Sequence, residues 1–317
     1  MLTSLETGVG LDVVLWLQAG GSSLLDLLAM ALNAAGSEYV FMVVLSVIYW
    51  SVNRQLGLRM RFALMLAVVL NTALKLLFQA PRPFHVSDAV RMVVEAGSYG
   101  LPSNHVMSAV AIWGYLALYL RRRWVTIVVV IYVLLMAWAR MYAGVHYPQD
   151  VVAGALLGAL SLWLSFWLER HFPPFWSRLP LSAQVALVVL AGIVLTVFLF
   201  EDAFGAAIAG VVVGTGLGYM AEQRYVRFSS AGDTTQRVLR CVLGIMFVLA
   251  VFFGARVLFG LFADDGTTLE NLLRVPRYAL LSFAAMFVWP WLALRAGLIQ
   301  AEDLSQPNAI PLQGKYQ

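Results

Sequence analysis

The chain has 317 residues, of which 61% are hydrophobic and only 12% are charged, and its formal net charge is +4 at pH 7. Soluble globular domains carry about 25% charged residues, so this composition excludes an ordinary soluble domain and is typical of a protein that crosses a membrane several times. Basic residues in such a protein mark cytoplasmic loops, and we therefore expect no nucleic-acid partner. The single cysteine, Cys241, excludes a disulfide framework.

The N-terminal residues 1–37 are apolar but interrupted by glycine and serine at 20–23. Each apolar piece is shorter than the roughly 20 residues that a membrane-spanning helix needs. We therefore expect N-terminal helices that lie at the membrane interface or re-enter the membrane, and one broken span is the alternative.

Long apolar runs separated by polar loops make up most of the remaining chain. They predict an all-α, polytopic membrane helix bundle with about nine spans. The spans are expected at residues 38–52, 62–80, 104–120, 124–142, 150–168, 183–200, 203–220, 241–262 and 278–297. We expect a basic loop at 53–61, a polar loop at 222–240 and a polar tail at 298–317. The span at 203–220 is rich in Gly and Ala, which predicts close packing against a neighbouring helix.

Arginines are concentrated in the loops that follow the first, third, fifth and seventh predicted spans. The positive-inside rule assigns these loops to the cytoplasm. The loops at 81–103 and 143–149 are then on the opposite side of the membrane, where two distant polar segments can meet.

Two motifs flank the loop at 81–103. Lys75 and Arg82 are seven residues apart, or about two helical turns, so we expect them on one face of the second span. Ser103 follows Pro102 as a natural N-cap, and His105 falls in the first turn of the third span, where free backbone N–H groups favour phosphate. Taken singly, Lys75 is equally well explained by an ammonium that reaches the interface, and Ser103 by an ordinary helix cap.

A third motif, from Arg140 to Asp150, lies between the fourth and fifth spans. Arg140 presents a fixed planar cation. Asp150 follows His146 by four residues, where it can hold one imidazole nitrogen and leave the other free to react. Together the three motifs suit a tetrahedral phosphoryl group: cations neutralise its charge, one histidine attacks phosphorus and the other protonates the leaving oxygen. Because no cluster in the sequence has the composition of a metal site, we expect chemistry without a metal or another cofactor.

The order and spacing of these motifs, Lys-x6-Arg-Pro, Pro-Ser-x-His and Arg-x5-His-x3-Asp, resemble the signature of the type 2 phosphatidic acid phosphatase superfamily, which contains integral-membrane lipid phosphate phosphatases. The resemblance covers about residues 62–168. It implies that His146 is the nucleophile that forms a phosphohistidine, that Asp150 orients this histidine, and that His105 is the general acid. It also implies a phosphate-binding set made of Lys75, Arg82, Ser103, Asn104 and Arg140.

Two positions depart from the pattern of this family. The family often has Ser where this chain has Ala139, and often has Gly where it has Asn104. The first change removes a supporting hydroxyl. The second alters how closely the backbone approaches phosphate, although the Asn amide can donate in its place. Neither change touches a group to which the resemblance assigns the chemistry.

These observations divide the chain into N-terminal helices at 1–37, a five-span phosphatase core at 38–168, a four-span extension at 183–297 and a polar tail at 298–317. The extension goes beyond the core of the family, although the family has long members with extra C-terminal spans. The sequence leaves three roles open for it: to enclose a lipid tail, to mediate dimerisation or to serve transport.

The function that we expect is hydrolysis of a lipid phosphomonoester or pyrophosphate at the outer leaflet, through a phosphohistidine. We expect a multi-pass protein of a bacterial inner membrane with its active site on the extracytoplasmic face. Phosphoryl transfer to a second lipid or sugar is one alternative, and a catalytically dead lipid transporter or scaffold is another. The expected substrate is a phospholipid or a polyprenyl or sphingoid phosphate; the sequence does not choose among them or define the oligomeric state.

Overall fold

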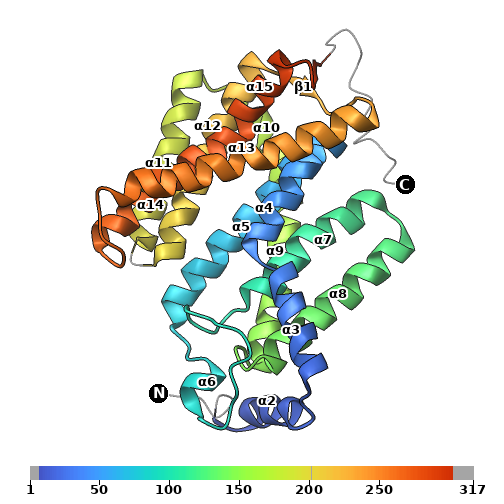
Figure 1. Ribbon diagram of the computed structural model, residues 1–317, viewed down its shortest axis with the longest axis vertical. Helices are drawn as coiled ribbons and strands as arrows, with labels where there is room; N and C mark the ends of the chain where they lie inside the picture. Colours follow the sequence, from blue (N-terminus) through green and yellow to red (C-terminus); the bar gives the residue numbers. More distant parts are fainter. Residues whose placement is uncertain (1–6, 201, 303–317) are drawn as a thin grey trace.

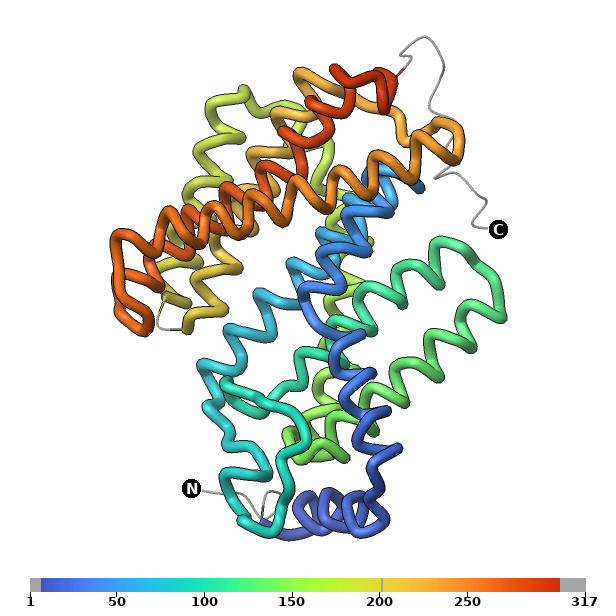
Figure 2. Tube along the Cα trace, viewed as in Figure 1, coloured from blue at the N-terminus to red at the C-terminus, as the bar shows by residue number. Residues whose placement is uncertain are grey.

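The computed structural model describes residues 7–200 and 202–302, which fold into a bundle of helices (Figure 1, Figure 2). One short antiparallel sheet pairs β1 (Phe228–Ser229) with β2 (Gln300–Ala301). Apart from this sheet, the regular elements are helices, so the predicted all-α fold class is confirmed. The polar tail predicted at 298–317 lies outside the described residues from 303 onward.

The N-terminal region consists of short helices, as predicted. They are α2 (Val9–Ala19), α3 (Ser23–Ala35) and α4 (Glu38–Val47), and α4 continues as a short π-helix, η1 (Ile48–Val52). The hydroxyls of Ser22 and Ser37 accept hydrogen bonds from the first turns of α3 and α4. The bend between α3 and α4–η1 is 52°, so this pair is a broken span or a re-entrant loop.

The core helices carry the three sequence motifs. They are α5 (Arg54–Phe78), α6 (Pro83–Val86), α7 (Asn104–Leu120), α8 (Arg123–Tyr142) and α9 (Pro148–His171). Helix α7 packs closely on α9, because a Cβ added at Gly158 would lie 2.7 Å from the Met107 carbonyl oxygen. In Figure 1, α7 and α8 form a hairpin on the side away from the C-terminal helices.

The C-terminal helices form a second group, which occupies the upper part of Figure 1. They are α10 (Pro173–Trp176), α11 (Leu181–Leu199), α12 (Ala203–Tyr225), α13 (Thr234–Gly260), α14 (Thr268–Phe283), the π-helix η2 (Ala284–Val288) and α15 (Trp289–Arg295). A Cβ added at Gly214 of α12 would lie 2.1 Å from the carbonyl oxygen of Ala279 in α14. The close packing predicted for residues 203–220 is thus confirmed.

Every predicted span lies on helical segments, although those at 38–52 and 278–297 each run over more than one, and two predicted loops are wrong. Residues 54–61 begin α5, because Asn53 caps this helix by accepting a hydrogen bond from the Leu56 N–H (2.8 Å). Helix α13 likewise begins at Thr234 instead of near residue 241, because Asp233 and Gln236 form a capping box at its start. Both segments were predicted as loops because they are rich in arginine, but arginine is also a good helix former.

Seven helical segments within the described ranges are long and apolar enough to cross a membrane. The bent pair α3 and α4–η1 makes an eighth if it counts as one span. Helix α7 has the bounds predicted for the third span, but its 17 residues fall short of the roughly 20 that cross a bilayer without adjustment. The bundle is therefore polytopic, with slightly fewer full-length spans than the predicted nine.

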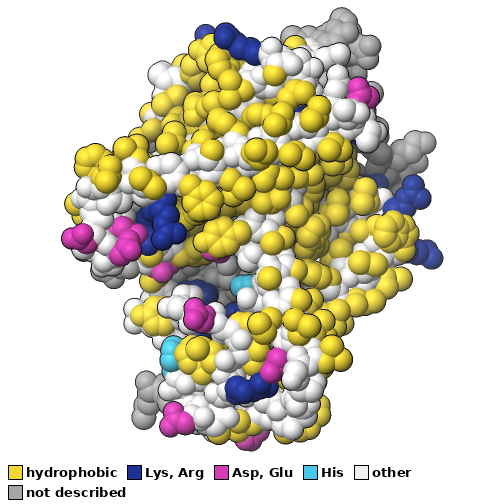
Figure 3. All heavy atoms as spheres, in the orientation of Figure 1, with side chains coloured by type: hydrophobic (Ala, Val, Ile, Leu, Met, Phe, Trp, Pro, Cys, Tyr) yellow, Lys and Arg dark blue, Asp and Glu magenta, His cyan; other side chains and the backbone are white. Residues whose placement is uncertain are grey.

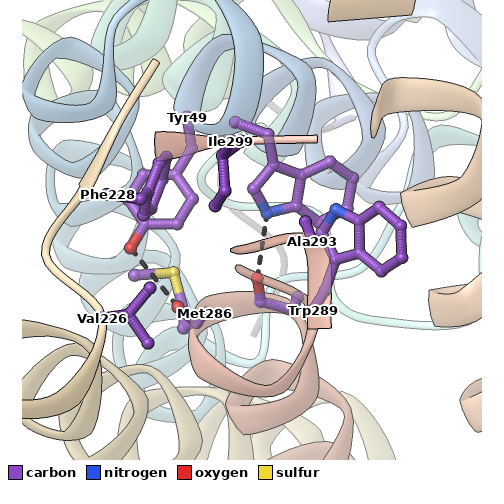
Figure 4. Close-up of a cluster of buried hydrophobic side chains, with 9 residues drawn as sticks. Tyr49, Val226, Phe228, Met286, Trp289, Ala293 and Ile299 are labelled. Carbon is purple, nitrogen blue, oxygen red and sulfur yellow. Dashed lines mark hydrogen bonds between the residues drawn. The ribbon is translucent and has the colours of Figure 1, made fainter. Parts of the chain in front are cut away.

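The core and the C-terminal helices share one hydrophobic cluster (Figure 4). The Tyr49 hydroxyl of η1 donates to the Met286 carbonyl oxygen (3.3 Å), and the Trp50 indole N–H donates to the Ala285 carbonyl oxygen (3.0 Å). Nearby, Arg54 of α5 forms an ion pair with the fully buried Glu222 of α12 (2.7 Å). These contacts hold the two groups of helices in a fixed relation.

Candidate active site

The three sequence motifs converge on one cavity of about 1040 Å³. On the face shown in Figure 3, the surface is hollowed below the C-terminal helices, and basic, histidine and acidic side chains meet in or beside the hollow. Six of the eight predicted site residues line this cavity: Lys75, Arg82, Asn104, His105, Arg140 and His146. Ser103 and Asp150 are buried and do not line it.

His146 and Asp150 form a buried pair at the start of α9. The Nδ1 atom of His146 lies 3.2 Å from Oδ2 of Asp150, and the same oxygen accepts the Tyr147 N–H (2.9 Å). The Asp150 carbonyl oxygen accepts the Ser103 N–H (3.0 Å), which fixes α9 against the start of α7. The carboxylate is therefore held in place by the backbone, and it holds the imidazole in turn.

Arg82 determines which nitrogen of His146 carries the lone pair. Its Nη1 donates to the Val145 carbonyl oxygen (2.7 Å) and lies 3.3 Å from Nε2 of His146. A guanidinium only donates hydrogen bonds, so Nε2 must be the acceptor and Nδ1 carries the proton that Asp150 accepts. This tautomer presents the lone pair of Nε2 on the cavity side.

Burial and the surrounding cations keep this imidazole neutral. His146 lies in the turn between α8 and α9 and is 1% exposed. Burial in the first place, and Arg82 and Arg140 in the second, lower the pKa of His146 well below its usual range. Only the neutral form has the lone pair that a nucleophile needs.

Lys75 and Arg82 meet on a residue that the sequence did not single out. The Lys75 ammonium donates to the Ser98 hydroxyl (2.9 Å), and Arg82 Nε donates to the Ser98 carbonyl oxygen (2.5 Å). The prediction that these two cations share one face of the second span is wrong, because α5 ends at Phe78 with Gln79 in a left-handed conformation (φ 46°). Arg82 instead occupies the N-cap position of α6, and the loop through Ser98 brings the cations together.

His105 and Arg140 meet near a second residue that the motifs did not indicate. A side-chain N–H of Arg140 donates to the Asn33 side-chain oxygen of α3, and Asn33, His105 and Arg140 all line the cavity. The Nε2 atom of His105 has no partner within residues 7–200 and 202–302. Since His105 lines the cavity, its ring is placed to exchange a proton with a bound group.

Ser103 occupies the predicted N-cap position of α7 but does not cap the helix with its hydroxyl. This buried Oγ has no hydrogen-bond partner among the described residues, and the residue packs against Gly154 of α9. Asn104 lines the cavity and accepts a hydrogen bond from the Ser108 hydroxyl (3.3 Å). Ala139, where the family often has Ser, is buried among Ala29 and Tyr142.

The C-terminal helices contribute one wall of the cavity, which the sequence did not predict. Asp202, Ala203 and Phe204, at the start of α12, line it together with Glu38 of α4. The sequence carries no motif for these positions, because they reach the site only through the packing of the two helix groups. In the described part of the chain, His, Cys, Asp and Glu side chains form no group of three or more that could hold a metal ion.

Comparisons with known proteins give a consistent result. Residues 56–174 match the family model of the PAP2 superfamily, and residues 206–302 match that of the PAP2 superfamily phosphatase transmembrane extension. The chain is 29% identical over 172 residues to an undecaprenyl-diphosphatase from Sulfolobus acidocaldarius, in an alignment that covers 53% of this chain and 83% of that protein. It is 32% identical over 87 residues to a lipid A 4'-phosphatase from Bacteroides thetaiotaomicron, covering 27% of this chain and 39% of that protein.

Among solved structures, Aquifex aeolicus LpxE is similar with 26% sequence identity and a TM-score of 0.47, over 50% of this chain and 95% of that chain. The apolar helices and the matched transmembrane extension identify a multi-pass membrane protein.

Proposed function

Because the chain belongs to the PAP2 superfamily, we propose that it is a membrane lipid phosphatase that hydrolyses a lipid phosphomonoester or pyrophosphate through a phosphohistidine. The relatives named above act, by their names, on undecaprenyl diphosphate and lipid A, which supports a lipid phosphate as the substrate class. The observation that carries the proposal is the placement of His146. It is held through Nδ1 by Asp150 and turns Nε2 toward a cavity lined by three cations.

In the first step of the proposed reaction, Nε2 of His146 attacks phosphorus and the bond from phosphorus to the leaving oxygen breaks. His105 gives its proton to that oxygen, so that the lipid leaves as a neutral alcohol or, from a pyrophosphate, as a protonated phosphate. Asp150 accepts the Nδ1 proton in a hydrogen bond and stabilises the positive ring that forms. It therefore acts through His146 and is a positioning residue.

In the second step, water attacks the phosphohistidine and the nitrogen–phosphorus bond breaks. His105, now neutral, takes the proton from water, and inorganic phosphate leaves with both histidines in their starting states. Lys75, Arg82 and Arg140 neutralise the phosphoryl oxygens in both steps. Asn104 and the free N–H groups at the start of α7 are further donors.

We also propose that the reaction needs no metal ion and that the site opens on the extracytoplasmic face. The three cations offer the charge neutralisation that a divalent metal supplies in other phosphoryl-transfer enzymes, which supports the first point. The arginines concentrated at and beyond the helix ends on the other side of the bundle support the second through the positive-inside rule.

The proposal is tested by phosphate release from detergent-solubilised protein with His146→Ala and, as a matched control, His171→Ala. His171 ends α9 and contacts Trp167, outside the cavity. We expect the first variant to lose phosphate release and acid-trapped phosphoenzyme, and the second to retain both. Full phosphate release by His146→Ala would refute the proposal, and labelled phosphate found on an added alcohol instead of in solution would indicate phosphoryl transfer.

A further inference from the structure

A second, smaller hollow lies between the core and the C-terminal helices. It has a volume of about 140 Å³ and runs along one face of α4 and η1, with α13 and α14 as its other walls. Its lining is almost entirely apolar and includes Met42, Val43, Leu249 and Phe252. We call it the inter-half groove. Figure 3 shows hydrophobic side chains covering the face on which α13 crosses the core.

The inter-half groove and the catalytic cavity adjoin at Tyr39. This side chain lines both spaces, and it stands one residue after Glu38, which lines the cavity. The C-terminal helices border both spaces as well: the start of α12 walls the cavity, while α13 and α14 wall the groove. A ligand whose polar end lies in the cavity can therefore extend past Tyr39 into the groove.

The opposite section of the groove is polar. Arg61 of α5 and Ser46 of α4 line it, with Arg61 Nη2 donating to the Ser46 hydroxyl (3.1 Å). The Nε atom of Arg61 has no hydrogen-bond partner among the described residues. Ser46 is seven residues after Tyr39, which places it about 10 Å along the helix. The apolar stretch between Tyr39 and Ser46 thus has Glu38 of the cavity beside one end and Arg61 beside the other.

We propose that the inter-half groove binds the hydrocarbon tail of the lipid whose phosphate occupies the catalytic cavity. This inference rests on the proposed function and gives the C-terminal extension a role in substrate binding. The lining of the groove matches a hydrocarbon chain, whereas the cavity matches a phosphate, and Tyr39 joins them in the order in which a lipid phosphate presents its two parts. The volume of the groove is close to that of a cavity that holds one benzene-sized ligand, about 150 Å³, so it takes a segment of one tail.

The test must use a tail that comes from water, because a tail that leaves a bilayer or a micelle gains little from another apolar surrounding. We therefore choose butyl, hexyl and octyl phosphate as monomers, with the full-length protein in nanodiscs, and measure kcat/KM for phosphate release. A methylene that moves from water into the groove is worth up to about a fourfold increase in kcat/KM. We expect the wild type to show a rise of this order with tail length.

The variant Val43→Trp fills the groove from α4, and Val40→Trp is its matched control. Val40 lies one turn away on the same helix, is similarly exposed (37% against 42%), and lines neither space. We expect Val43→Trp to reduce the rise to less than about twofold per methylene. Val40→Trp should show the wild-type dependence on tail length, because it leaves the groove open. Partition of the alkyl phosphates into the nanodisc is the same for the two variants and cannot cause a difference between them.

A second pair of variants lies on α13 of the C-terminal extension and replaces the first pair if Val43→Trp fails to fold. Leu249→Trp fills the groove from α13, and Met246→Trp lies about one turn earlier on α13, outside the groove. An equal dependence on tail length in a filled variant and its control would overturn the inference. That result would leave the proposed function intact, because the loss of butyl phosphate hydrolysis in His146→Ala tests that function separately and does not depend on the groove.

Discussion

The clearest test of how Asp150 orients His146 is the substitution Asp150→Asn. One oxygen of Asp150, Oδ2, both faces Nδ1 of His146 and accepts the Tyr147 N–H, so the amide either keeps its oxygen at this point, with both hydrogen bonds but without the negative charge, or turns its NH2 group there and loses both. In the second case, the NH2 group donates where the carboxylate accepted, so Nδ1 of His146 becomes the acceptor and the proton moves to Nε2. The nitrogen that is to attack phosphorus then has no lone pair.

The expected loss has two parts. A hydrogen bond to a charged group contributes about 1.5–3 kcal/mol, which at about 1.36 kcal/mol for each factor of ten in rate corresponds to about 10- to 150-fold in kcat. The reversed tautomer adds to this, and the same exchange in a Ser-His-Asp triad costs about 10⁴-fold. We therefore expect kcat to fall by between about 10- and 10⁴-fold. KM should change little, because Asp150 does not line the cavity.

The assay combines steady-state phosphate release with acid quenching, which measures how fast phosphoenzyme forms. Asp26→Asn is a suitable control, because Asp26 pairs with Arg91 (2.5 Å) outside the cavity. That variant should keep its activity. If Asp150→Asn retained kcat within about threefold of wild type at an unchanged melting temperature, or lost activity through KM alone, the role given to Asp150 would be wrong.

Three further predictions concern pH, packing and a buried ion pair. Burial first, and the surrounding cations second, lower the pKa of His146 below the ordinary 6.5, so its neutral form is lost only as pH falls through the lowered value. Phosphoenzyme formation from p-nitrophenyl phosphate, whose leaving group needs no general acid, should therefore persist from about pH 7.5 to about pH 6. An apparent pKa at or above 6.5 for this step would contradict the argument. Gly214→Ala should lower the melting temperature, at a cost of about 1–3 kcal/mol, since its Cβ would meet a carbonyl oxygen on α14 at 2.1 Å; Gly254→Ala, with open space around it, should not. Glu222→Gln should cost about 1.5–3 kcal/mol in unfolding experiments, because it removes the fully buried carboxylate that pairs with Arg54 and leaves this arginine with only its more exposed second partner, Glu302. Glu270→Gln, whose partner is 26% exposed, should cost less than about 1 kcal/mol, and equal losses would refute the argument.

The sequence predicted those parts of the site that depend on spacing along one element. His146 and Asp150 are one helical turn apart, and the local geometry of the turn into α9 brings them together. The positions of the apolar runs predicted the helices in the same way. The convergence of the three motifs also followed from the sequence, because loop charges assigned them to one side of the membrane.

The parts that depend on tertiary packing could not be predicted. Ser98 and Asn33 are single small polar residues, one in a loop and one in an apolar helix, and no spacing relates them to the cations that they contact. Asn33 does carry a weak signal, because a polar side chain inside an apolar helix needs a partner. The wall formed by Asp202 had no signal at all, since it depends on how α12 packs beside α5.

The shared cluster around Tyr49 and Trp50 has a consequence for how the molecule denatures. Although the two family matches cover separate ranges of the chain, the aromatic side chains of η1 are buried by η2, α15 and the strand residue Phe228. Neither half can lose its structure without exposing the side chains on which the other packs. Core and extension should therefore melt in a single cooperative transition, and the core expressed without residues 175–302 should fail to accumulate as a folded protein.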